Sequence, residues 1–283
     1  MRRGVVITSL VTSLAAGAAA VAGPALAAPA SAATGRAVGL MEQAGPRQVL
    51  PARGGTVDSL NWSGYVVDPG RGVSEVTSTF TVPSASLLPP GFAATWAGIG
   101  GYKTTDLIQA GVAEDSLPSL PLVGPQYYAW YEVLPNAATP LTNCTGDASC
   151  TVAPGDAVTV TIAEQSASNT WKITVQDHST SHPGWTSVTT VKYASSGSSA
   201  EWILEAPQLA GLQTLMAPLS IVHFGPTSTF TTASGATTDL AAGAPTKIDQ
   251  SLFGVVPEST PSSIASDEQS FNDCTYTTSC PAP

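Results

Sequence analysis

The chain has 283 residues, and its 10 Lys and Arg against 20 Asp and Glu give a formal net charge of −10 at pH 7. This composition excludes nucleic acid as a partner, because binding to phosphates needs a basic surface that the chain lacks. Charged residues make up only 11% of the chain, so the charge of its surface would change little in an acidic medium.

Residues 1–33 have the pattern of an export signal rather than of a folded segment. Arg2 and Arg3 precede an apolar run rich in Ala and Gly, and the sequence ALAAPASAA provides an A-x-A cleavage site that closes at Ala33. The alternative is a membrane anchor, which the shortness of the run and Pro24 disfavour. We therefore expect a mature protein that is secreted, extracellular and not held in a membrane.

Residues 34–56 contain scattered Gly, Pro and Arg without periodicity, which predicts a linker or a short propeptide. Residues 57–283 follow as a single domain, since about 225 residues is a length that β-sandwiches often reach. Alternation of apolar and polar residues between turn signals predicts strands at 76–82, 157–162, 171–175 and 187–193. The fold class is therefore all-β, an antiparallel two-sheet β-sandwich of the concanavalin or lectin-like kind. Residues 226–247, rich in Thr, Ala, Gly and Pro, are expected to form a long loop.

Polar side chains stand beside large aromatic ones in several of the expected strands. Alternation along residues 107–112 places Gln109 on the face opposite to the apolar side chains, and along residues 200–205 it places Glu201 opposite to Trp202. In residues 127–135, Trp130 and Glu132 share one face. Such a surface is a solvated outer face, a sugar-binding platform or a catalytic groove, and alternation alone favours the solvated face.

The four cysteines form two local pairs. In an exported protein an even number of cysteines predicts disulfides, and three connectivities are possible. Each pair encloses five residues, which does not fit the C-x₂₋₄-C spacing of zinc ligands. We expect the two local bridges, each contributing about 2–3 kcal/mol because it closes a small loop. They are Cys144–Cys150 and Cys274–Cys280.

The motifs of the common hydrolases are absent from the sequence, which has no G-x-S-x-G, no H-E-x-x-H, and no Asp-Thr-Gly or Asp-Ser-Gly. His178 and His182 are four residues apart, but the turn-like sequence DHSTSHPGW predicts a solvated loop rather than a metal site. The third histidine, His223, could in principle belong to a Ser-His-Asp triad, but no motif in the sequence supports one. We expect neither a metal nor a cofactor.

Five motifs, in order, resemble those of the glutamic peptidases called eqolisins, a family first known from fungi. Residues 61–64 match its N-W-[AS]-G pattern, residues 95–99 are similar to A-W-x-G-I, and residues 107–112 to I-L-Q-x-G-V. Residues 129–135 match A-W-Y-E-x-x-P, and residues 200–205 match A-E-W-I-x-E. Each motif alone is weak, but the ordered set is specific, and the resemblance covers about residues 57–260.

The resemblance implies an acid-acting endopeptidase whose partners are protein or peptide substrates. It implies Gln109 and Glu201 as a catalytic dyad that activates water directly, without a covalent intermediate. Glu201 would accept the water proton and return it to the leaving amine, while Gln109 would hold the water and stabilise the oxyanion. The expected substrate-binding residues are Trp62, Trp96, Trp130 and Glu132.

The sequence departs from the fungal pattern at two positions, where fungal members carry Asp and this chain has Gly100 and Ala113. Neither the subsite preference nor the pH profile therefore follows from the resemblance. Two other functions stay open: a carbohydrate-binding, lectin-like module, and a glycosidase that uses Glu132 and Glu201 as carboxylates about 5–10 Å apart. We expect a monomer.

Overall fold

The computed structural model describes residues 47–48, 56–117, 124–166 and 168–283. These residues belong to one compact unit that spans Gly35–Pro283. The expected export signal, and all of the expected linker except residues 47, 48 and 56, lie outside the described residues. Among the described residues, no helix is long and apolar enough to span a bilayer.

The described part of the chain is almost entirely β-structure, as the sequence predicts. Its first nine strands are β1 (Val57–Ser59), β2 (Trp62–Val67), β3 (Val73–Thr81), β4 (Ala94–Gly100), β5 (Leu107–Asp115), β6 (Gln126–Val133), β7 (Thr139–Pro140), β8 (Ala157–Glu164) and β9 (Thr170–Asp177). The others are β10 (Trp185–Lys192), β11 (Ala200–Glu205), β12 (Gln208–Leu209), β13 (Leu212–Gln213), β14 (Val222–Thr232), β15 (Thr237–Asp239), β16 (Thr246–Leu252), β17 (Val256–Pro261) and β18 (Phe271–Thr275), with a short 3-10 helix η1 (Ala241–Gly243).

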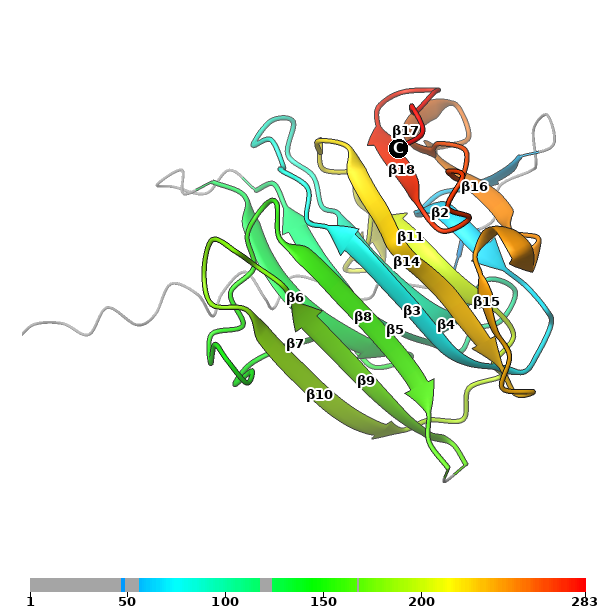
Figure 1. Ribbon diagram of the computed structural model, residues 1–283. Coiled ribbons are helices and arrows are strands. Elements are labelled where there is room, and N and C mark those ends of the chain that lie inside the picture. The colour runs from blue at the N-terminus through cyan, green and yellow to red at the C-terminus, as the bar shows by residue number, and fades with distance from the viewer. Residues whose placement is uncertain (1–46, 49–55, 118–123, 167) are drawn as a thin grey trace, which may run out of the picture. The chain divides into compact units, whose positions relative to one another are not determined.

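The strands form two layers (Figure 1). The front layer contains β10, β9, β8, β3 and β14, and the rear layer contains β2, β11, β4, β5, β6 and β7, each in this hydrogen-bonded order. Strands β18, β17 and β16 connect the layers, and all neighbours along this path are antiparallel. The predicted antiparallel β-sandwich is confirmed, with the difference that the two layers are parts of one continuous hydrogen-bonded sheet.

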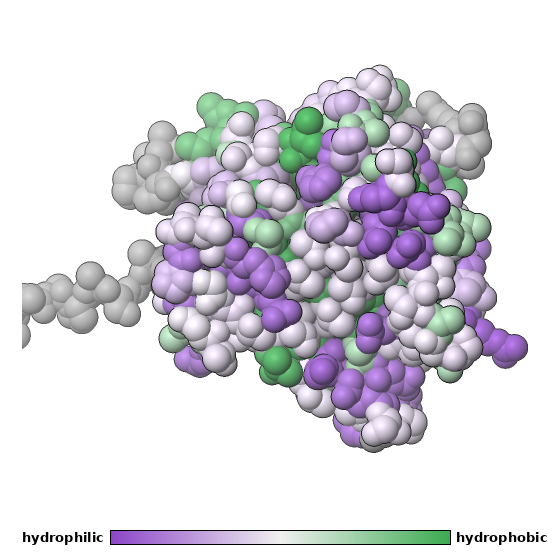
Figure 2. Space-filling view, viewed as in Figure 1, coloured by the Kyte–Doolittle hydropathy of each residue, from purple (hydrophilic) through white to green (hydrophobic). Residues whose placement is uncertain are grey.

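The main core lies between the layers and follows from period-2 alternation. Val158 and Ile162 of β8 are buried in the same apolar cluster as Ile108 and Val112 of β5. The intervening threonines of β8 face outward, and Thr159 hydrogen-bonds across to β3. Figure 2 shows this outer face covered mainly by weakly hydrophilic residues, with strongly hydrophilic ones in separate clusters.

The opposite face of the rear layer carries a second apolar cluster, which includes Trp62, Trp96, Trp130 and Ile203. In an ordinary sandwich this outward face would meet solvent and alternate polar with apolar residues. Here β2, β4 and β11 are buried on both faces. The face that alternation alone would leave solvated is therefore an enclosed surface.

The expectation of a long loop at residues 226–247 is wrong. Strand β14 continues to Thr232, and β15, η1 and the start of β16 follow. The pairing of β14 with β3 shifts register between Phe224 and Ser228, so Pro226 lies at a β-bulge, one of the few places where a sheet accepts proline. The threonines that follow are β-branched and suit a strand.

Both expected local disulfides are present in the structure. Cys144 is bonded to Cys150, and Cys274 is bonded to Cys280. The first bridge closes the loop before β8, and the second ties the chain end to β18.

Candidate active site

The polar residues singled out in the sequence lie in one row across the rear layer. Glu201 of β11 pairs with Gly98 of β4, Gly98 pairs with Gln109 of β5, and Gln109 pairs with Glu132 of β6. Residues in register on adjacent strands place their side chains on the same face. The structure thus brings Glu201, Gln109 and Glu132 together on the face that carries the second apolar cluster.

Gly98 separates the two residues of the expected dyad. Two strand spacings put the backbones of Glu201 and Gln109 about 10 Å apart, a distance that their two side chains can bridge around one small molecule. Position 98 itself contributes no side chain between them, and the Trp96 ring of β4 packs over it. A Cβ at position 98 would lie 2.8 Å from Cζ3 of Trp96 and 3.2 Å from Cβ of Gln109. The row therefore needs a residue without a side chain here.

Glu132 fixes the side chain of Gln109. The Gln109 amide nitrogen donates a hydrogen bond to Oε2 of Glu132 over 2.6 Å, and both side chains are fully buried. Burial raises the pKa of Glu132 to about 8, against a smaller lowering by the hydrogen bond from Gln109. In acid Glu132 is therefore neutral and places no negative charge beside the row.

Glu201 lies in a strongly desolvated position. Burial raises its pKa well above the ordinary value of 4.5, the nearby Ser199 side chain lowers it by less, and the charges of Asp106 and Asp68 raise it further. In the enclosed site Glu201 is therefore protonated in acid. Solvent must reach this carboxyl group before it can ionise there.

The three expected tryptophans belong to one apolar cluster beside the row. The rings of Trp62 and Trp96 meet edge to face with centroids 5.0 Å apart. Trp96 donates its indole N–H to Glu205 over 2.9 Å, and Asn61 donates to the same carboxyl group over 3.0 Å. The sequence predicts an open groove lined by these rings, but each tryptophan has zero exposure in the structure.

Two further residues of this face have a clear structural task that sequence reasoning missed. Glu205, four positions after Glu201 and on the same face, orients Trp96 and Asn61, and its even spacing in the strand was a usable signal. Asp115 of β5 accepts a hydrogen bond from Tyr128 over 3.2 Å. It lies two positions beyond Ala113 and on the same face, so this chain has an acidic residue close to the position where the fungal pattern has one.

The glycosidase alternative does not fit the row. Glu132 and Glu201 are three strand spacings apart, which separates their backbones by about 14 Å. Gln109 lies between them and holds Glu132 by a hydrogen bond. A paired-carboxylate mechanism needs about 5–10 Å between the carboxyl groups with the reacting bond between them, and this arrangement does not provide it.

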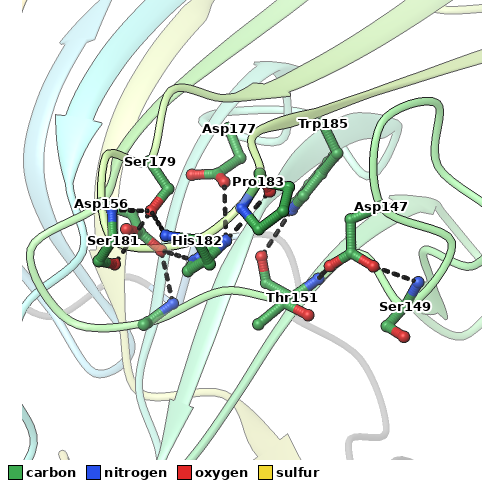
Figure 3. A network of polar contacts seen from close by, with 11 residues as sticks. Asp147, Ser149, Thr151, Asp156, Asp177, Ser179, Ser181, His182, Pro183 and Trp185 are labelled. Carbon is green, nitrogen blue, oxygen red and sulfur yellow. Dashed lines mark hydrogen bonds and ion pairs between the residues drawn. The ribbon is translucent and has the colours of Figure 1, made fainter.

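A second polar cluster joins Asp156, Asp177 and His182 at the ends of β8 and β9 in the front layer (Figure 3). The expected loop lies between β9 and β10, and His178 is exposed there, whereas His182 is partly buried and has polar partners. Its Nε2 lies 2.8 Å from Asp156 Oδ2, and its Nδ1 lies 3.1 Å from the Pro183 carbonyl oxygen and 3.8 Å from Asp177 Oδ2. Because both ring nitrogens face oxygen acceptors, the imidazolium form fits this position best, and the cluster forms a structural ion pair in the other layer.

Comparisons with known proteins find likenesses to this chain in sequence and in fold. The sequence model described as the peptidase A4 family matches residues 60–270. A crystal structure of scytalido-glutamic peptidase with a transition state analog inhibitor aligns with TM-score 0.59 and 18% identity over 76% of this chain and 98% of that chain. SCP-B, a member of the eqolisin family solved with a tripeptide, aligns with TM-score 0.55 and 19% identity over the same shares. A search of curated proteins finds no match.

Proposed function

Because the chain belongs to the peptidase A4 family, we propose that it is an acid-acting endopeptidase in which Gln109 and Glu201 act together on a water molecule. The observation that carries this proposal is the row Glu201–Gly98–Gln109. It places one ionisable and one amide side chain on the same face, with a residue that has no side chain in register between them.

Glu201 is the residue of the row that can accept a proton from water. As a carboxylate it would take the proton while the water attacks the carbonyl carbon of the substrate. It would then return the proton to the nitrogen of the leaving amine. No covalent bond to the enzyme is needed, because the attacking group is water itself.

Gln109 is suited to the developing oxyanion, because an amide does not titrate and donates at any pH. Its nitrogen carries two hydrogens, so it can donate to Glu132 and to an oxyanion at the same time. Its carbonyl oxygen can accept a hydrogen bond from the attacking water. Removing one donor of this kind costs about 10²–10³ in rate.

Whether Glu201 can ionise depends on whether solvent and substrate can reach it. Burial is the largest cause of its raised pKa, so admitting solvent and substrate lowers that pKa toward the ordinary value. Only then does a useful fraction ionise in acid. The enclosed structure is accordingly proposed to be a latent state of the enzyme.

We propose that the segment before the domain contributes to this latency. The backbone N–H of Arg47 donates to the Gly101 carbonyl over 3.2 Å, and its guanidinium lies 4.4 Å from the centre of the Tyr102 ring. Gln48 accepts and donates hydrogen bonds around Ser59 and Asn61. These contacts support a propeptide role for residues 34–56, and removal of that segment, after export directed by residues 1–33, as the activation step.

The substrate is proposed to be an extended peptide that lies over the face of Trp62, Trp96 and Trp130 once it is open. The two related proteins named above were solved with an inhibitor and with a tripeptide, which suits this class of ligand. The protein is proposed to act as a monomer.

The direct test is digestion of casein at about pH 3, close to the range where carboxyl groups titrate, with pepstatin present to suppress aspartic peptidases. We expect cleavage that pepstatin does not abolish, and faster cleavage once the chain begins near Val57. A folded, trimmed protein that binds polysaccharide and leaves casein intact would instead establish the lectin-like alternative.

A further inference from the structure

Gly100, one of the two departures from the fungal pattern, ends β4 next to the catalytic row. Its φ of +88° requires glycine, and its N–H donates to the Ser199 carbonyl over 3.1 Å. A Cβ at position 100 would lie 2.5 Å from the carbonyl oxygen of Asp106 and 3.1 Å from its Oδ2. The space for a side chain at position 100 is thus already filled by Asp106, which comes from the loop between β4 and β5.

Asp106 holds the segment that leads into β11. Its Oδ2 accepts a hydrogen bond from the backbone N–H of Ser196 over 2.6 Å and another from the Ser195 hydroxyl over 3.3 Å. In the same loop the Thr104 hydroxyl lies 3.5 Å from that of Ser198. These contacts, together with the bond from Gly100 to Ser199, fix the chain just before Glu201.

Asp106 loses its proton more readily than an ordinary aspartate. Burial raises its pKa, but the hydrogen bonds from Ser196 and Thr104 outweigh burial, so the pKa lies below the ordinary value of 3.8. Its negative charge is the first charge to raise the pKa of Glu201, ahead of Asp68. Asp68 is paired with Lys103 at 2.5 Å, whereas no cation among the described residues forms an ion pair with Asp106.

Apart from Asp106 and Asp68, the described elements around Glu201 contribute no group that is negatively charged in acid. Strands β2 and β4, which flank β11, carry no acidic or basic side chain. Glu205 lies on β11 itself, and Glu132 lies beyond Gln109, both with raised pKa values that keep them neutral in acid. On the remaining side, Arg47 lies over Tyr102 at the start of the loop that ends in Asp106.

We propose that Asp106 is a positioning residue for Glu201. Asp106 supplies, from the loop between β4 and β5, the carboxylate that the fungal pattern places at position 100. It also fixes the chain segment that leads to Glu201. This inference rests on the proposed role of Glu201. It assigns to Asp106 no contact with substrate.

The test is a titration of the Glu201 carboxyl group by carbon NMR in the full chain labelled at glutamate Cδ, with the resonance assigned by its loss in Glu201→Gln. Asp106→Asn removes the charge and should lower the midpoint by on the order of half a pH unit, while Asp106→Glu should keep it. Asp106→Ser removes the same charge and should lower the midpoint likewise. Asp147→Asn is the matched control, because Asp147 likewise accepts hydrogen bonds from backbone N–H groups but is partly exposed and distant in sequence from the row.

An unchanged midpoint in folded Asp106→Asn would overturn the inference. If Asp106→Asn does not fold, the same measurement on Asp106→Ser decides, since it removes the same charge and keeps a hydroxyl acceptor for the Ser196 N–H. Casein cleavage by the same proteins distinguishes a failure of the proposed peptidase function from a failure of the inference about Asp106. An inactive wild type with the expected titration shifts would remove the peptidase mechanism and leave the influence of Asp106 on Glu201.

Discussion

Gly98 is the residue on which the geometry of the row depends most, and it carries no functional group of its own. Gly98 matters because it has no side chain. The Trp96 ring packs over Gly98, and Gln109 and Glu201 lie in register on either side of it. The sequence motif around Trp96 contains this glycine, but only the register of β4 between β11 and β5 shows why a larger residue would interfere.

Gly98→Ala should lower kcat/KM by about 100-fold, the cost of displacing reacting groups by about 1 Å. The added methyl group should also destabilise the fold by about 1–3 kcal/mol through overpacking. Gly243→Ala is the matched control, since its Cβ would be as crowded, 2.7 Å from Val67 and 2.8 Å from Phe230, at a position outside the row. Full activity in Gly98→Ala would show that the two side chains do not work across this position.

At the scale of the strands, alternation was the reliable guide. It placed Gln109 and Glu201 on the face opposite to the core side chains and Glu132 on the face of Trp130, and the pairing of β11, β4, β5 and β6 brings these side chains to one face. Period 2 assigns faces, but it contains no information about which strands become neighbours. The order of the row therefore could not be obtained from the sequence.

Two features of the elements escaped sequence reasoning for physical reasons. The continuation of β14 through Pro226 depends on a bulge, which is set by the partner strand β3. The enclosure of Trp62 and Trp96 depends on contacts from outside their own strands. Asp106 gave no sequence signal at all, because its importance comes from the space left at Gly100.

For the whole molecule, the most consequential property is the number of buried carboxyl groups. Burial raises the pKa of Asp115 to about 7, of Asp273 to about 7 and of Glu132 to about 8. It also raises those of Glu114 and Glu205 well above the ordinary value. A carboxyl group whose pKa is raised by folding stabilises the fold fully below its unfolded value of about 4, and this stabilisation is lost as the pH rises through the folded value.

The melting temperature should therefore be highest in acid and fall as the pH rises through about 7–8. Asp273→Asn keeps an acceptor for Ser63 and Ser259 but cannot ionise. The melting temperature of this variant should therefore decrease less between acid and neutral pH, by about 2–4 °C for each kcal/mol of unfolding free energy that is no longer lost. Glu164→Gln, at an exposed position, serves as the control. Calorimetry that found the wild type steadily more stable from acid to neutral pH would contradict this interpretation.

The central claim is that Glu201 supplies the base and Gln109 the neutral donor, and the most direct test is kcat/KM for peptide cleavage in acid by three variants, with circular dichroism as the control for folding. Glu201→Gln keeps the shape and should abolish activity. Gln109→Glu should be nearly inactive, because a second carboxyl group replaces the amide donor and shares a proton with Glu201. Glu132→Gln should be the mildest, since Glu132 orients Gln109 through one hydrogen bond. Folded Glu201→Gln with substantial activity would contradict the account, as would Glu132→Gln inactive beside an active Gln109→Glu.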